Sequence, residues 1–271
     1  MDNRPIGVFD SGLGGLTAVR ELDRLLPGED IVYFGDTGRV PYGSRSKDII
    51  IKYARQDVAF LNTFDLKAIV IACGTVSSTA LEVLREENSV PVLGVVDPAA
   101  QAAAQASRGG RIGLIGTETS IRSGAYERAL SRLRPEAEVF PKACPLFVPL
   151  VENGRFRPGD AVAELVVAEY LTPLKQAGVD TLVMGCTHYP LLRPAIAAFF
   201  GPEVTLIDAG GACARQVAAL LRSTGALSER EAGGGHRYFV SDSVDGFARL
   251  ASLFLGEDVA GHVEQVDITL F

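Results

Sequence analysis

The sequence predicts an α/β protein built from parallel β-sheets. Strand-length apolar runs alternate with segments of helical periodicity along nearly all of the 271 residues, which is the pattern of α/β folds. Several runs are apolar at consecutive positions, as expected of strands that a parallel sheet buries on both faces. A third observation is that parts of the first half of the chain recur in the second half, which indicates a duplicated unit.

The expected strands are short segments in which apolar residues predominate. In chain order they are Ile6–Asp10, Ile31–Gly35, Ala68–Ala72, Val92–Val96, Ile112–Gly116, Glu138–Lys142, Thr181–Gly185, Val204–Ile207 and Arg237–Ser241. Between them, helical periodicity is clearest over Ser46–Phe64, Asp160–Ala177 and Ala212–Arg222. Ser46 and Asp160 are residue types suited to cap the first two of these helices at their N-termini.

The internal repeat is visible when the ends of the strands are compared. Three pairs of positions correspond in local sequence: Ile6 with Ile112, Cys73 with Cys186, and Asp97 with Asp208. Their similar separations along the chain favour a duplication. We therefore expect two similar αβα domains related by pseudo-twofold symmetry, the first formed by residues 1–98 and 211–271 and the second by residues 99–210. Small-molecule sites favour the cleft between such domains, so we expect the active site there.

Composition and charge exclude several classes of protein. The net charge is −7 and there is no basic run, so nucleic acid is not an expected partner. The apolar stretches are too short to span a membrane, and the first residues lack the apolar core of a signal peptide, so we expect a cytoplasmic protein. Four cysteines in a chain of this size are expected to be free thiols rather than a disulfide framework.

Two of these cysteines, Cys73 and Cys186, directly follow apolar strands. Side chains at the carboxyl ends of parallel strands point into the ligand crevice. Two thiols presented by two similar half-molecules suggest proton transfer on both sides of one carbon centre, with inversion. A thiol near the start of the helical run Thr79–Glu87 would also have its thiolate favoured, although a buried structural role for Cys73 is the alternative.

Cys186 is followed by Thr187 and His188, and His188 could exchange a hydrogen bond with a thiolate or a substrate. A phosphatase loop is excluded, because Arg193 is one position too far from the cysteine and the intervening residues lack glycine. A zinc site formed by Cys73, Cys186 and His188 remains an alternative, although no second histidine or Cys-x-x-Cys pair lies nearby.

Carboxylates follow other apolar segments. Asp10 precedes a glycine-rich turn that would suit an anion or a close approach to a ligand, but Asp10 itself would repel the pyrophosphate of a dinucleotide. Asp36 follows a strand and Glu152 follows an apolar run with few other charges, and either could simply be solvated. Cys144 and Cys213 are expected to be packing residues of the core.

Five motifs, taken in order, resemble the bacterial glutamate racemases of the aspartate/glutamate racemase family. They are Asp10-Ser11-Gly12-x-Gly14-Gly15, Pro41-Tyr42-Gly43, Ala72-Cys73-x-Thr75, Pro149-Leu150-Val151-Glu152 and Gly185-Cys186-Thr187-His188-Tyr189-Pro190. The resemblance extends from Ile6 to about Leu221. Each motif is short, but their common order makes the set specific.

The resemblance implies an isomerase that interconverts L- and D-glutamate without a cofactor or a metal and supplies D-glutamate for peptidoglycan, and hence for cell wall biogenesis and cell shape. It implies that Cys73 and Cys186 are the acid/base pair, with Asp10 and His188 as their assistants and Asp36 and Glu152 as further polar support. It also implies a homodimer. The substrate-binding residues implied by the resemblance are Asp10, Ser11, Tyr42, Gly43, Gly74, Thr75, Thr117, Ser120, Thr187 and His188.

The chain departs from the family at two of these positions. Gly74 stands where the family commonly has asparagine, which removes a side-chain contact but leaves the backbone N–H, and Ser120 replaces a threonine while keeping the hydroxyl. Two alternatives stay open. One is an aspartate racemase or a related two-cysteine isomerase, and the other is a redox or binding protein in which Cys73 and Cys186 form a reversible disulfide.

Overall fold

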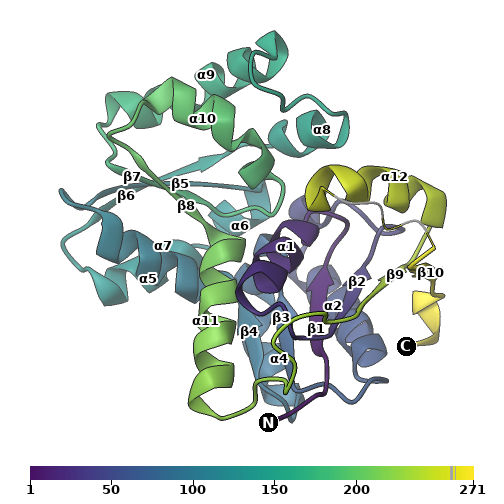
Figure 1. The fold of residues 1–271 in the computed structure, drawn as a ribbon. Helices are drawn as coiled ribbons and strands as arrows, with labels where there is room; N and C mark the ends of the chain where they lie inside the picture. The colour runs from purple at the N-terminus through teal and green to yellow at the C-terminus, as the bar shows by residue number, and fades with distance from the viewer. Residues whose placement is uncertain (257–258, 260) are drawn as a thin grey trace.

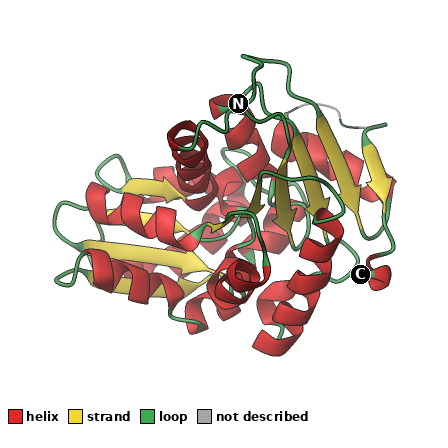
Figure 2. Cartoon of the chain, turned by 90° about the horizontal axis from the view of Figure 1, so that it is seen from below, coloured by secondary structure: helices red, strands yellow, loops and turns green. Residues whose placement is uncertain are grey.

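The computed structural model consists of two parallel β-sheets with helices packed on both faces of each (Figures 1 and 2). It describes residues 1–256, 259 and 261–271. The predicted fold class, α/β with two parallel-sheet domains, is confirmed. Among the residues that the structure describes, no helix combines the length and the apolar composition that a membrane span requires.

The first sheet has the strand order β10-β9-β2-β1-β3-β4, and every neighbouring pair is parallel. Its strands are β1 (Ile6–Asp10), β2 (Ile31–Gly35), β3 (Ala68–Ile71), β4 (Val92–Gly94), β9 (His236–Val240) and β10 (Val263–Gln265). The helical segments around this sheet are α1 (Leu16–Leu25), η1 (Tyr42–Ser44), α2 (Lys47–Leu61), α3 (Gly74–Thr79), α4 (Leu81–Glu87), α12 (Val244–Leu255) and η3 (Ile268–Leu270).

The second sheet has the order β6-β5-β7-β8 and is also parallel throughout. Its strands are β5 (Arg111–Gly116), β6 (Glu138–Ala143), β7 (Thr181–Met184) and β8 (Thr205–Asp208). The remaining helical segments are α5 (Val96–Ala106), α6 (Glu118–Arg122), α7 (Ala125–Leu133), α8 (Phe147–Glu152), α9 (Ala161–Gln176), η2 (Tyr189–Leu192), α10 (Arg193–Phe200) and α11 (Ala209–Ser223).

The two sheets share one hydrophobic core. Val8 of β1 and Leu114 of β5 are fully buried members of the same apolar cluster. Helix α11 packs against both α1 and α5, beside the first sheet (Figure 1). Helices α5 and α11 lie where the two halves meet, so the assignment of strands to sheets does not determine where the chain passes from one domain to the other. The domain boundaries near residues 98 and 210 therefore stay a prediction.

Some element ends differ from the sequence prediction. The strand expected over Val92–Val96 ends at Gly94, because α5 begins at Val96 with Asp97 and Pro98 in its first turn, where an acid and a proline favour a helix start. The last helix expected from the periodicity begins three residues earlier, at Ala209, where the side chain of Asp208 accepts a hydrogen bond from the amide of Gly211. The short strand β10 was not predicted.

The two predicted helix caps have different outcomes. The Asp160 side chain accepts hydrogen bonds from the amides of Val162 and Ala163, so the predicted cap of α9 is confirmed. Ser46 stands at the N-cap position of α2, but its side chain makes no capping hydrogen bond.

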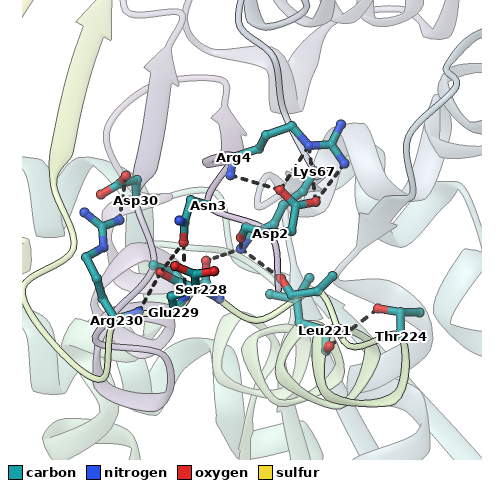
Figure 3. Close-up of polar contacts among 12 residues, drawn as sticks. Asp2, Asn3, Arg4, Asp30, Lys67, Leu221, Thr224, Ser228, Glu229 and Arg230 are labelled. Atoms are coloured by element: carbon teal, nitrogen blue, oxygen red, sulfur yellow. Dashed lines mark hydrogen bonds and ion pairs between the residues drawn. The ribbon is translucent and has the colours of Figure 1, made fainter.

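The N-terminal segment is tied to the loop after α11 by a buried polar cluster (Figure 3). The Lys67 ammonium donates to the carbonyl oxygens of Asp2 at 2.7 Å and Ala226 at 3.0 Å, and it forms an ion pair with the buried carboxylate of Glu29. Glu29 in turn accepts a hydrogen bond from the amide of Ser228 at 2.8 Å. This cluster closes the end of the first sheet that lies opposite the carboxyl ends of its strands.

Candidate active site

A cavity of about 350 Å³ lies where the carboxyl ends of the two sheets face each other. Loops that follow strands of both sheets supply its walls. Its lining includes Ser11, Gly12, Tyr42, Gly43, Cys73, Gly74, Thr75, Thr117, Glu118, Cys144, Glu152, Cys186, Thr187 and His188. Most of the site residues predicted from the sequence are therefore gathered around one cavity, as expected for loops at the carboxyl ends of parallel strands.

Cys73 belongs to the wall formed by the first sheet. It follows β3, stands at the N-cap position of α3, and is 5% exposed. Its thiol donates a hydrogen bond to the Ser11 hydroxyl, with 3.3 Å between Sγ and Oγ. Burial raises the pKa of Cys73 to about 12, and the nearby carboxylate of Asp10 adds to the increase. Cys73 is therefore a thiol rather than a thiolate.

Cys186 lies on the wall formed by the second sheet, beside an imidazole. Its Sγ is 4.0 Å from Nδ1 of His188, and Nε2 of His188 donates a hydrogen bond to Glu152 at 3.0 Å. Burial alone would lower the pKa of His188, but its interactions with Cys186 and Glu152 raise that pKa to about 10. The ring of Phe254 meets His188 edge-on, with 5.6 Å between the ring centroids. The histidine is therefore held as a buried imidazolium beside the second cysteine.

Asp10 lies behind the cavity wall rather than in it. It is 1% exposed, accepts a hydrogen bond from the Gly12 amide at 3.1 Å, and accepts another from the Thr187 hydroxyl at 3.5 Å. Burial raises the pKa of Asp10, and His188 opposes this increase. Because Thr187 comes from the opposite sheet, Asp10 links the glycine-rich turn after β1 to the loop that carries Cys186.

A chain of hydroxyls crosses the cavity between the two sheets. Thr75 and Thr117 share a hydrogen bond of 3.0 Å, and Thr117 and Ser120 share one of 2.9 Å. Thr117 also accepts a hydrogen bond from the Ser120 amide at 3.3 Å. Thr75 and Thr117 line the cavity, whereas Ser120 is fully buried behind Thr117. Thr117 can therefore contact a ligand while Ser120 fixes its orientation.

Asp36, like Asp10 and Ser120, is a predicted site residue that does not reach the cavity lining. It is fully buried, and it accepts hydrogen bonds from the Tyr42 hydroxyl, from Arg39 at 2.6 Å and from Ser241 at 2.7 Å. A second buried carboxylate, Asp57 on α2, accepts from the same tyrosine at 2.9 Å and from the same arginine at 2.6 Å. Burial and the neighbouring Asp36 raise the pKa of Asp57 well above its usual value. The cluster holds Tyr42, whose ring lines the cavity.

Some residues in or behind the cavity wall were not predicted as site residues from the sequence, among them Glu118, Asp57 and Cys144. Asp57 was missed, and the available signal was an acid on the inward face of α2 between the buried residues Ala54 and Leu61. Cys144 was expected in the core. It is indeed fully buried, but it also lines the cavity, and its carbonyl accepts a hydrogen bond from Tyr189 at 3.0 Å.

The charges around the cavity limit what it can bind. Among the residues that the structure describes, no lysine or arginine lines the cavity, and the charged side chains that do are Glu118, Glu152 and His188. A bound anion would therefore depend on hydroxyl and backbone N–H donors and on the imidazolium of His188. In the same described part of the chain, no group of three or more His, Cys, Asp or Glu side chains is arranged to hold a metal ion, so the zinc alternative has no donor set there.

The fold and the site together define a class of protein. Two thiols reach one small cavity from two parallel sheets, and each has its own polar neighbours, Ser11 for Cys73 and His188 for Cys186. Such a pair of proton-transfer groups is typical of an acid/base isomerase that acts on a small polar molecule.

Comparisons with known proteins specify the class further. The family model Asp/Glu/Hydantoin racemase matches residues 19–217. A glutamate racemase from Geobacter metallireducens is 49% identical over 265 residues, which cover 98% of this chain and 97% of that protein. A glutamate racemase from Streptococcus pneumoniae serotype 19F is 46% identical over 269 residues, covering 99% of this chain and all of that protein.

Solved structures agree with this result. The glutamate racemase isoform RacE1 from Bacillus anthracis has a TM-score of 0.93 at 40% identity, with 98% of each chain covered. A glutamate racemase from Francisella tularensis, in complex with D-glutamate, has a TM-score of 0.91 at 36% identity, with both chains covered in full. The chain belongs to the Asp/Glu/hydantoin racemase family. The resemblance predicted from the sequence is thereby confirmed, and so is the enzyme class, because racemases are isomerases.

Proposed function

We propose that the protein is a glutamate racemase that interconverts L- and D-glutamate by proton transfer between Cys73, Cys186 and the α-carbon, without a cofactor. The observation that carries the proposal is that corresponding strands of the two sheets each deliver one thiol to the same cavity of about 350 Å³. Inversion at a carbon needs a base on one face and an acid on the other, and two thiols from opposite walls can fill these roles.

The lining of the cavity supports a substrate of this kind. The Francisella tularensis relative was solved with D-glutamate. Glutamate carries two carboxylates, and hydroxyls of Ser11, Thr75, Thr117 and Thr187 line the cavity together with the backbone of Gly74. These neutral donors can bind carboxylates together with the imidazolium of His188.

The surroundings of the two thiols suggest how turnover begins. Cys73 is a thiol, because its pKa is about 12, and Cys186 lies beside an imidazolium that attracts a thiolate. In the direction that uses this form, Cys186 removes the α-proton and the Cys73 thiol delivers a proton to the opposite face. The reverse direction starts from Cys73 as the thiolate. After each turnover the two cysteines have exchanged protonation states.

The thiols alone do not supply the rate. A positioned general base contributes about 10²–10⁴-fold, or about 3–5.5 kcal/mol. We assign the remainder to hydroxyl and N–H donors that stabilise the enolate-like charge on the substrate carboxylate, in a cavity that excludes water. Thr75 and Thr117, which are already hydrogen-bonded to each other, are preorganised for this role.

The carboxylates around the site act through other groups. Glu152 orients His188 through its hydrogen bond, and Asp10 holds the Thr187 hydroxyl and lies close to Cys73. Asp36 does not touch the cavity, so we assign it to positioning Tyr42. On the strength of the family resemblance we also propose that the protein is a cytoplasmic homodimer whose D-glutamate enters peptidoglycan.

The test is circular dichroism of L-glutamate and of D-glutamate, each incubated with the pure protein, excess reductant and no added cofactor. Both signals should decay to zero, and in D₂O the product should carry deuterium at the α-carbon. Cys73→Ala and Cys186→Ala should each abolish the decay. Cys213→Ala is the matched control, because this cysteine is buried on α11 and does not line the cavity.

Each alternative has its own outcome in this test. Racemisation of L-aspartate but not of L-glutamate would replace the proposal by an aspartate racemase. Absence of any racemisation, together with a Cys73–Cys186 disulfide after removal of the reductant, would favour the redox protein. Full activity in either cavity-cysteine variant would refute the two-thiol mechanism.

A further inference from the structure

The two loops that carry the cysteines touch each other through a pair of glycines. Gly74 directly follows Cys73, and Gly185 directly precedes Cys186. A Cβ atom built on Gly74 would lie 2.1 Å from the Gly185 carbonyl oxygen and 3.8 Å from the Cα of Cys186. Real Cβ atoms essentially never come within 3.0 Å of another heavy atom in this way. Position 74 therefore has no room for a side chain, and the obstacle is backbone from the opposite sheet.

The Gly185 side of this contact cannot move away locally. The Gly185 amide donates a hydrogen bond to the Ile115 carbonyl at 2.8 Å, which fixes it to the neighbouring strand β5. A Cβ atom on Gly185 would lie 3.2 Å from both Cζ and Oη of Tyr126, and this tyrosine is fully buried. A tyrosine ring and a strand thus support Gly185 from behind.

The Gly74 side is equally constrained. Gly74 is the first residue of α3, and the carbonyl of Cys73 accepts the Ser77 amide at 2.9 Å. The Ser77 hydroxyl donates to the Ile71 carbonyl at 2.8 Å, which ties the helix back to the end of β3. A Cβ added at position 74 would therefore force a shift of the two loops or of the two sheets that carry them.

We propose that Gly74 is a positioning residue: the absence of a side chain there lets the two cysteine loops meet and so sets the separation of the two thiols across the cavity. The proposal rests on the proposed racemase function. Other hydrogen bonds that cross between the sheets also require the two loops to lie this close together. They include the pair Thr75 and Thr117 at 3.0 Å and the bond from the Thr17 hydroxyl to the Thr187 carbonyl at 2.9 Å.

Because Gly74 stands where the family commonly has asparagine, substitutions at this position can distinguish a role in substrate contact from a role in loop spacing. If position 74 served only to contact substrate, Gly74→Asn would restore the amide that the family commonly carries, and the KM for glutamate would fall. If Gly74 sets the spacing of the loops, Gly74→Asn and Gly74→Ala are both harmful for the same reason, because both add a Cβ. The effect should then fall mainly on kcat, since displacement of a reacting group by about 1 Å can cost about 100-fold.

The experiment compares Gly74→Ala and Gly74→Asn with Gly246→Ala, a control on α12 whose added Cβ would meet nothing closer than 3.4 Å. For each folded variant, kcat and KM are measured by circular dichroism. The rate of iodoacetamide alkylation at Cys73 and at Cys186 is followed by mass spectrometry. We expect kcat to fall by about 10- to 100-fold in both Gly74 variants. We also expect alkylation of both cysteines to accelerate, and the control to match wild type.

Unchanged kcat in Gly74→Ala, faster turnover in Gly74→Asn, or unaltered alkylation would each overturn the proposal. Alkylation does not depend on the substrate, so it tests the loop contact even if the wild-type protein fails to racemise glutamate, which would refute the proposed function instead. If neither Gly74 variant folds, hydrogen exchange of the wild-type protein decides. The amides of Gly185 and Ser77, which donate to the carbonyls of Ile115 and Cys73, should be protected without ligand, and exchange of either at loop-like rates would contradict a rigid contact between the two loops.

Discussion

Replacing His188 by glutamine tests the electrostatic pairing of the second thiol. Glutamine keeps a polar side chain of similar length but cannot carry a positive charge. In the wild-type protein the imidazole lies between Cys186, at 4.0 Å from Sγ, and Glu152, at 3.0 Å. The substitution therefore removes the cation beside the thiol while leaving the cavity similar in volume.

The pKa of His188 gives the size of the effect. Burial opposes the charged form, yet the interactions with Cys186 and Glu152 raise the pKa from 6.5 to about 10, a net preference for the imidazolium of about 5 kcal/mol. This preference is shared between two partners, so only part of it acts on Cys186. A loss of about 3 kcal/mol at the transition state would lower kcat/KM by about 100-fold, within the usual range for one acid/base group.

The choice of assay depends on the fact that substrate and product are enantiomers. Enantiomers have equal free energies, so kcat/KM is the same in both directions for every variant, and the ratio of directions carries no information. We therefore pair kcat/KM with alkylation of each cysteine at neutral pH. His188→Gln should slow the alkylation of Cys186, which loses its cationic neighbour, and leave Cys73 nearly unaffected. Equal slowing of both thiols, or an unchanged kcat/KM, would refute the pairing.

Three further predictions concern binding and stability. Thr117→Val removes the hydroxyl that is hydrogen-bonded to Thr75. We expect the KM for glutamate to rise about 10-fold, with little loss of fold stability. An unchanged KM would show that Thr117 does not bind the substrate. Lys67→Met leaves the buried carboxylate of Glu29 without its cation and should lower the free energy of unfolding by about 3–5 kcal/mol, as measured by urea denaturation. The pKa of His188 is raised in the folded state, so the stabilisation by its positive charge is fully present below pH 6.5 and is lost as the pH rises towards about 10. The difference in the free energy of unfolding between wild type and His188→Gln should therefore shrink between pH 6.5 and about 10.

The central strands and the two thiols could be predicted because their signal is local. A strand buried on both faces must be apolar at nearly every position, and the residues just beyond its carboxyl end must lie at the ligand edge of the sheet. The sequence therefore predicts that Cys73, Cys186 and Thr187 lie near one another. Strands β1, β2 and β5 begin and end at the predicted residues or within one of them.

The polar groups behind the cavity could not be predicted in the same way. Asp36 and Asp57 lie on different elements and meet only because Arg39 and Tyr42 fold back between them. No sequence spacing encodes that meeting. The same reason explains Cys144, whose place in the cavity wall depends on the packing of a loop from β6 against the loop after β7.

The two thiols follow corresponding strands of the two sheets but have different charged neighbours. The strands before Cys73 and Cys186 correspond, but one thiol lies close to the carboxylate of Asp10 and the other beside the imidazolium of His188. In the proposed mechanism the two enantiomers bind to forms of the enzyme that differ in which thiol is protonated, and an imidazolium beside Cys186 stabilises one of these forms. Because the two enantiomers have equal free energies, this difference changes the populations of the two enzyme forms but not the equilibrium between L- and D-glutamate. We therefore expect the unequal neighbours to keep Cys73 protonated before substrate binds, whereas two identical environments would not distinguish the two thiols.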